Sequence, residues 1–221
     1  MFWPGRRQGD AATAIGIAPQ ELLGILDRAR IAELVRLERF YRDQGEWEKL
    51  HACYTDDATV TTTWFDGTAK EFAEASQEMA VQRGRHTKHL ITPTNIRING
   101  DRALVESYGE IHFRDDLEGV EVDTIMYCRF FSRVRRTADG WRLASFEGIY
   151  QRDVITPVDP AESLPVDWNE LRRLRPSYRV WAYTLGRRGY DVSSEKVGDD
   201  RPDLVAAFYA AADRWLETGE S

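Results

Sequence analysis

The sequence predicts an α+β fold, with three helices followed by a curled antiparallel meander of strands. Two features of the chain carry this prediction. Apolar residues recur at helical spacing as far as about residue 83, and from His89 onward they alternate with polar residues at a period of two. Turn sequences at hairpin spacing separate the alternating segments, so we expect consecutive strands to pair in antiparallel fashion.

The first helix is expected over residues 20–44, where leucine and isoleucine recur at helical spacing until Gly45 ends the run. A short second helix is expected over residues 46–54. The β-branched and aromatic residues 59–64 then predict a strand, and Asp66–Gly67 predicts the turn that follows it. These elements lead the chain towards a third helix.

That third helix is expected over residues 69–83, where apolar side chains share one stripe. Four strand candidates follow it, and three short turn segments rich in glycine, asparagine and aspartate separate them. The strands are expected over residues 90–98, 102–114, 121–135 and 141–152.

The composition changes after Pro157 and Pro160. Residues 168–190 and 203–217 are expected to be helical, with a polar link between them. We therefore divide the chain into three parts: a flexible arm over residues 1–19, the main domain over residues 20–158, and a helical extension over residues 159–221. The extension is expected to be a lid or an oligomer contact.

The bulk properties exclude several classes of protein. The net charge of −7 disfavours nucleic acid as the main partner, and no apolar run is long enough to span a bilayer. The start of the chain has no apolar segment of the kind that directs export, so we expect a cytoplasmic protein. Cys53 and Cys128 fit neither a CxxC pair nor a zinc ribbon.

Asp43 and His89 are the candidate catalytic residues. Asp43 stands at the end of the first helix, and His89 stands just before the alternating segments begin. A carboxylate and an imidazole that face one closed pocket can move protons without a cofactor. The alternatives are that Asp43 caps the helix beginning at Glu46, and that His89 is a core histidine with its hydrogen bonds satisfied.

His112 and His86 are two further candidate site residues. Strand alternation places Ala103, Val105, Ser107, Gly109, Ile111 and Phe113 on the pocket side, and His112 on the other face unless a β-bulge switches the faces. We keep His112 as a candidate substrate contact. His86 lies three residues before His89, but no third ligand is evident, so we expect no metal site.

Glu38 lies five residues before Asp43, on an adjoining helix face. If it is buried, its pKa would be raised and it could serve as an acid. It could equally be a solvated partner of Arg42. The remaining candidate substrate contacts are aromatic residues and one methionine, about half of which we expect to contact a ligand. They are Tyr54, Trp64, Phe72, Met79, Tyr127, Phe146 and Tyr150.

Three motifs, taken in order, carry a family resemblance: Asp-x-x-Glu-Trp-x-x-Leu from Asp43, Thr-Asp-Asp-Ala from Thr55, and Thr-x-His ending at His89. With the element order, they resemble the SnoaL-like branch of the nuclear transport factor 2-like superfamily over residues 22–155. The resemblance implies a cone, in which a curved sheet wraps around helices and leaves one apolar pocket. Members include scytalone dehydratase, limonene epoxide hydrolase, ketosteroid isomerase, polyketide cyclases and formaldehyde-releasing lyases.

The resemblance implies that Asp43 and His89 act as acid and base on a hydroxylated substrate. Arg42 and Thr62 stand near the positions where scytalone dehydratase has two tyrosines, which argues against an identical reaction. We expect a cofactor-independent lyase that removes a hydroxyl group from an aromatic small molecule, by dehydration or with release of formaldehyde from an aryl diol. The alternatives are a ketosteroid-isomerase-like or cyclase-like isomerase and a non-catalytic binding module. The superfamily also implies a dimer or trimer.

Overall fold

The computed structural model describes residues 16–83 and 87–220, so most of the expected N-terminal arm lies outside the described residues. Among these residues the helices are α2 (Pro19–Gln44), α3 (Trp47–Ala52), α4 (Ala69–Arg83), α5 (Trp168–Leu171), α6 (Arg179–Gly186) and α7 (Pro202–Thr218). The strands are β1 (Tyr54–Thr61), β2 (Asp66–Thr68), β3 (Thr87–Asn99), β4 (Arg102–Leu117), β5 (Val120–Thr137) and β6 (Gly140–Pro157).

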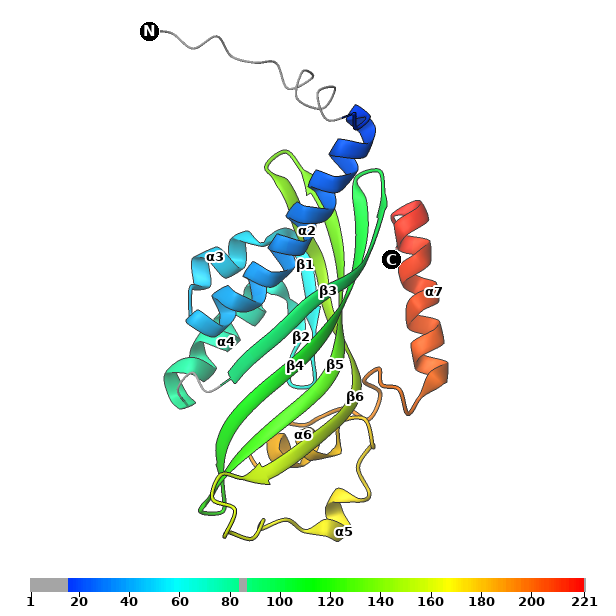
Figure 1. Ribbon diagram of the computed structural model, residues 1–221. Coiled ribbons are helices and arrows are strands. Elements are labelled where there is room, and N and C mark those ends of the chain that lie inside the picture. Colours follow the sequence, from blue (N-terminus) through cyan, green and yellow to red (C-terminus); the bar gives the residue numbers. More distant parts are fainter. Residues whose placement is uncertain (1–15, 84–86, 221) are drawn as a thin grey trace, which may run out of the picture.

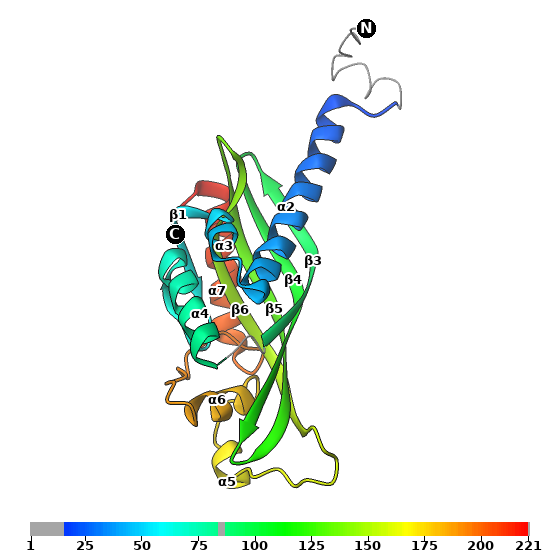
Figure 2. The same ribbon diagram turned by 90° about the vertical axis from the view of Figure 1, so that its left-hand side faces the viewer.

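The predicted α+β fold is confirmed. The sheet has the strand order β2-β1-β6-β5-β4-β3, and it curves around the helices α2, α3 and α4 (Figures 1 and 2). The meander β3–β6 is antiparallel as expected, but β1 pairs with β6 in parallel. This parallel pair is possible because α4 and the whole meander separate the two strands in the chain, which is a connection long enough for a crossover.

Two local predictions were wrong. The turn after β1 is made by residues 62–65, where the Thr62 N–H donates to the Phe65 carbonyl at 2.8 Å, and Asp66–Gly67 instead pair back onto β1. The expected helix over residues 168–190 is broken into α5 and α6. Pro176 lies in the break, and a proline cannot donate the backbone hydrogen bond that a continuous helix would need there.

The strands β4, β5 and β6 carry buried residues on both faces. The inner face of the sheet packs against α2 and α4, with Val105 and Phe130 in this inner core. Its outer face packs against α7, where Leu104, Phe131 and Trp215 belong to a second hydrophobic core. Neighbouring residues of a strand point to opposite faces, which is why a single strand serves both cores.

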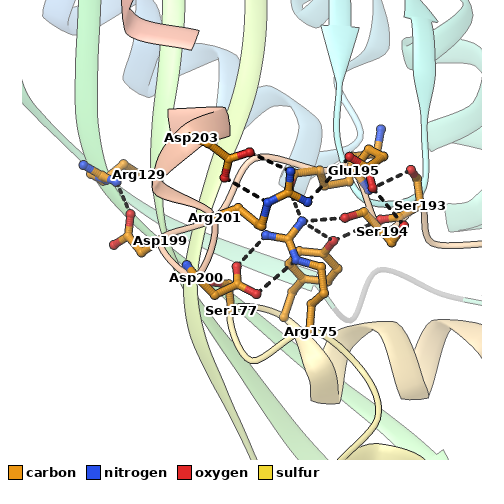
Figure 3. Close-up of polar contacts among 12 residues, drawn as sticks. Arg129, Arg175, Ser177, Ser193, Ser194, Glu195, Asp199, Asp200, Arg201 and Asp203 are labelled. Atoms are coloured by element: carbon orange, nitrogen blue, oxygen red, sulfur yellow. Dashed lines mark hydrogen bonds and ion pairs between the residues drawn. The ribbon is translucent and has the colours of Figure 1, made fainter. Parts of the chain in front are cut away.

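The link between α6 and α7 is pinned to the rest of the extension (Figure 3). Arg175 donates to Asp200 at 3.0 Å through Nε, and also to the carbonyls of Ser194 and Lys196 at 2.6 and 2.7 Å. The link also follows β6, because the Tyr150 N–H donates to the Val197 carbonyl at 2.9 Å. In Figure 1, α6 lies near the lower end of the sheet, and α7 runs upward beside the sheet.

Candidate active site

A cavity opens on the inner face of the sheet, with about 680 Å³ of empty space including its mouth. Its wall comes from α2, the 62–65 turn, α4, the strands β3–β6 and α6. Its lining is mostly apolar with a few polar side chains, and a lining of this kind is typical of small-molecule sites. The polar side chains in the wall include Arg39, Arg42, Thr62, Thr87, His89 and Thr184.

Asp43 and His89 are in direct contact. The ring nitrogen Nδ1 of His89 lies 2.7 Å from Asp43 Oδ1, and the backbone N–H of His89 donates to Asp43 Oδ2, also at 2.7 Å. An ionised carboxylate can only accept, so the proton of the imidazole is on Nδ1. The second ring nitrogen, Nε2, is therefore the one that can accept a proton.

The local sequence explains this contact. α2 ends at Gly45, whose φ of 73° is the left-handed conformation that glycine adopts readily, so Asp43 lies in the last turn of the helix. His89 is the third residue of β3, which runs beside α2. Both Asp43 oxygens bind His89, and the N-cap Glu46 of α3 makes no side-chain capping bond. The alternative of Asp43 as a helix cap is therefore wrong.

The sequence analysis expected both side chains to face one cavity, but they do not. His89 lines the main cavity, whereas Asp43 lines a smaller adjoining cleft with Trp47, Ser76 and Ala80. Asp43 therefore lies behind the imidazole and fixes its orientation.

Burial controls the charge of this pair. It lowers the pKa of His89 to about 4, against the opposing effect of Asp43, and the nearby Arg42 and Arg39 lower it further. Burial also opposes ionisation of Asp43, but its bonds to His89 hold the pKa of the carboxyl below its usual range. At neutral pH the pair is thus a carboxylate and a neutral imidazole.

Glu38 and Tyr54 do not line the cavity. Glu38 is buried, forms an ion pair with Arg39, and accepts a hydrogen bond from the Tyr54 hydroxyl at 2.7 Å. Glu38 as a substrate contact, Glu38 as a solvated partner of Arg42, and Tyr54 as a pocket residue are therefore all wrong. Glu38 and Tyr54 thus lie behind Arg39, which itself lines the cavity.

The other candidate contacts divide unevenly. Trp64, Phe72, Met79, Phe146 and Tyr150 line the cavity, whereas Tyr127 does not. The guanidinium carbon of Arg152 lies over the Tyr127 ring, 3.9 Å from its centroid.

His112 lies away from the cavity. The β4–β5 pairing runs without a register shift, so no bulge switches the faces of β4. Ile111 and Phe113 line the cavity, while the His112 side chain is 36% exposed and bonded to Glu110 at 2.8 Å. The alternation argument was right, and keeping His112 as a substrate contact was wrong.

None of the candidate site residues lies in α6, yet Trp181, Thr184 and Leu185 all line the cavity. The Trp181 Nε1–H donates to Thr63 Oγ1 at 2.9 Å, and the Trp181 backbone N–H donates to Asp153 Oδ2 at 2.8 Å. The apolar run around Trp181 was the available signal, since it lies in a segment otherwise rich in charge. Arg39 and Arg42 were missed as wall residues as well.

Within residues 16–83 and 87–220, no group of three or more histidine, cysteine or acidic side chains could hold a metal ion. His86, weighed above as a partner of His89 in a metal pair, lies outside the described residues. None of the described helices is long and apolar enough to cross a membrane.

A model of the SnoaL-like domain matches residues 24–147, which is more than half of the chain. The chain belongs to the SnoaL-like family. It is also similar to pea pathogenicity protein 2 of Fusarium vanettenii, with 29% identity over 87% of this chain and 86% of that protein.

Solved structures resemble the cone. A protein of Kribbella flavida matches 57% of this chain and 90% of its own, with 23% identity and a TM-score of 0.50. A protein of Novosphingobium aromaticivorans provisionally named scytalone dehydratase matches 65% of this chain and 95% of its own, with 19% identity and a TM-score of 0.48. These likenesses concern the fold, which hosts many different reactions.

Proposed function

We propose that this SnoaL-like protein is a cofactor-independent lyase that removes a hydroxyl group from an aromatic small molecule. The observation that carries the proposal is the Asp43–His89 pair, with a neutral imidazole in the wall of an aromatic cavity. A neutral histidine oriented by a carboxylate is a general base ready at neutral pH. The predicted cytoplasmic location and dimeric or trimeric state remain predictions.

In the proposed dehydration, His89 Nε2 removes a proton from the carbon next to the one that bears the hydroxyl group. The C–O bond breaks, a carbon–carbon double bond forms, and the imidazolium returns the same proton to the departing hydroxyl, which leaves as water. Asp43 keeps the proton on Nδ1 and stabilises the transient imidazolium, so it acts as a positioning residue.

The same base also accounts for an aldehyde-releasing reaction. On an aryl diol with a terminal hydroxymethyl group, Nε2 would remove the proton of that hydroxyl group. The adjacent C–C bond then breaks, formaldehyde forms, and the benzylic hydroxyl leaves as water with the returned proton. The products are one alkene, one formaldehyde and one water, so the reaction needs no oxidant or reductant.

The position of Asp43 disfavours the ketosteroid-isomerase alternative. That alternative requires the aspartate itself to meet the substrate, but Asp43 lies behind the imidazole and outside the main cavity. Among the described residues of the wall, His89 is the base available to a ligand in this cavity.

The test is to incubate the protein with hydroxylated aryl-propane diols and to follow alkene absorbance and formaldehyde. We expect turnover that falls by about 10²–10⁴-fold in His89→Gln and Asp43→Asn, the range for a positioned acid–base group. His112→Gln is the matched control, because this histidine lies on the outer face. Equal turnover in all three variants would remove His89 from the proposal, and no turnover in the wild-type protein would favour a binding module.

A further inference from the structure

Arg42 is a buried cation in the cavity wall. Its side chain is only 9% exposed, and its Nε has no hydrogen-bond partner. The nearest carboxylate oxygen, Asp43 Oδ1, lies 3.8 Å from Nη1, which is too far for a hydrogen bond, and that oxygen already accepts from His89. Within the described parts of the chain, Nε of Arg42 is therefore a buried donor without a partner, and Nη1 has only this long contact with Asp43.

We propose that the cavity recognises a carboxylate group on an aromatic ligand, and that the guanidinium of Arg42 binds it. As a statement about the substrate, this inference rests on the proposed lyase function; as a statement about binding, it does not. A buried donor group without a partner is costly, so a site that retains one gains most from a ligand that supplies the acceptor.

The other arginines of the wall already have acidic partners. Arg39 binds both carboxylate oxygens of Glu38, and Arg188 forms an ion pair with Asp115. The nearest carboxylate to Arg42 is Asp43, which also binds His89. At 3.8 Å from Nη1, this carboxylate balances the charge of Arg42 only in part. Among the described wall residues, Arg42 is thus the cation best placed to meet a ligand anion.

The surroundings of Arg42 favour a carboxylate on an aromatic frame. The rings of Trp64 and Phe72 lie 5.9 and 5.7 Å from its guanidinium carbon, so an aromatic body attached to the anion would contact apolar walls. A carboxylate matches the planar guanidinium through two parallel hydrogen bonds. A neutral amide offers one acceptor and no charge, so it leaves the buried cation unbalanced.

The position of Arg42 also ties this contact to His89. Arg42 lines both the main cavity and the adjoining cleft that contains Asp43. A carboxylate held there would orient the rest of the ligand along the wall that contains the imidazole. The inference therefore adds an anchoring group to the site, separate from the group that moves protons.

The test uses three pairs of probes: benzoate, phenylacetate and 3-phenylpropanoate, each with its uncharged amide. Binding is measured by titration calorimetry and by the fluorescence of Trp64 and Trp181 in the wall. We expect the wild-type protein to prefer at least one acid over its amide by about 10- to 100-fold, the range for hydrogen bonds to a charged group. Arg42→Gln should remove this preference.

Arg133→Gln is the matched control. Arg133 also has a buried Nε without a partner, but it lies on the outer face over the ring of Trp215. This variant should keep the full preference for the acid.

Several results would overturn the proposal: equal binding of acids and amides by the wild-type protein, no binding of any probe at millimolar concentration, or an acid preference that survives in Arg42→Gln. Loss of the preference in Arg188→Gln instead would move the anchor to another arginine. If Arg42→Gln does not fold, the wild-type comparison of acid and amide still decides.

The outcome is separable from that of the lyase proposal. Acid preference without diol turnover would refute the lyase and leave the carboxylate site in place. Diol turnover without acid preference would do the reverse.

Discussion

Replacing His89 with glutamine should change how the stability of this protein depends on pH. Burial lowers the pKa of His89 to about 4 from a reference value of 6.5. Between these two values the unfolded chain binds a proton that the folded chain does not, so the stability due to a neutral His89 is present above pH 6.5 and is lost as the pH falls. Glutamine does not titrate and removes this loss.

The magnitude follows from the size of the shift. Each pKa unit corresponds to about 1.4 kcal/mol, so the whole window from pH 6.5 to pH 4 is worth about 3 kcal/mol. Between pH 8 and pH 5.5 the wild-type protein should lose roughly 1–2 kcal/mol relative to His89→Gln. Asp153, whose pKa burial raises to about 6, contributes with the opposite sign, but it is present in both proteins and cancels in the difference.

Urea unfolding of both proteins at pH 8 and pH 5.5 measures this difference. NMR titration of the His89 ring gives the folded-state pKa independently. The opposite result, a wild-type protein that gains stability over the variant as the pH falls, would mean that Asp43 raises the pKa of His89 above 6.5. If the NMR titration then gives a pKa above 7, the imidazole is mainly charged at neutral pH and its role as a base is refuted.

Three further predictions test the fold around the site. In Gly109→Ala the new Cβ would lie 2.3 Å from the Phe130 ring, so urea unfolding should show a loss of about 1–3 kcal/mol, whereas Gly24→Ala, in open space on α2, should be neutral or stabilising. Asp153→Ala removes the carboxylate that accepts the Trp181 backbone N–H at the start of α6, so the free energy of unfolding should fall by about 1 kcal/mol. Proteolysis after residue 186 should become faster, and unchanged proteolysis would contradict an anchoring role. Burial raises the pKa of Cys53 to about 12 and raises that of Cys128 further, so a thiol reagent at pH 8 should modify both only after unfolding, and rapid modification of either in the folded protein would contradict their burial.

Periodicity was sufficient to predict most of the fold and part of the site. The switch from helical to alternating spacing near His89 located the start of the meander, and alternation along β4 placed His112 on the outer face. Both inferences depend on local geometry, which each segment carries in its own residues. The break before α6 was missed because apolar spacing continues through Pro176.

The remaining features depend on contacts between distant segments. Asp43 and His89 are 46 residues apart in the sequence. Only the packing of β3 on α2 determines that His89, and not Asp43, lines the main cavity. The sequence left open whether Glu38 is a buried acid or a solvated partner of Arg42. In the structure the Tyr54 hydroxyl, 16 residues away, donates to Glu38. Side-chain partners of this kind follow from tertiary packing and not from spacing along one helix.

The two-sided burial of the sheet has a consequence for how the ligand preference of this protein can change. In the pairs Phe130 and Phe131, and Tyr150 and Ile149, the first member lies on the inner face and the second packs in the outer core with α7. In each pair, the position where a mutation would reshape the cavity is therefore adjacent in sequence to the position where a mutation would weaken the packing of α7. Directed evolution that varies only the inner member of each pair could explore new ligands while the α7 interface keeps its side chains.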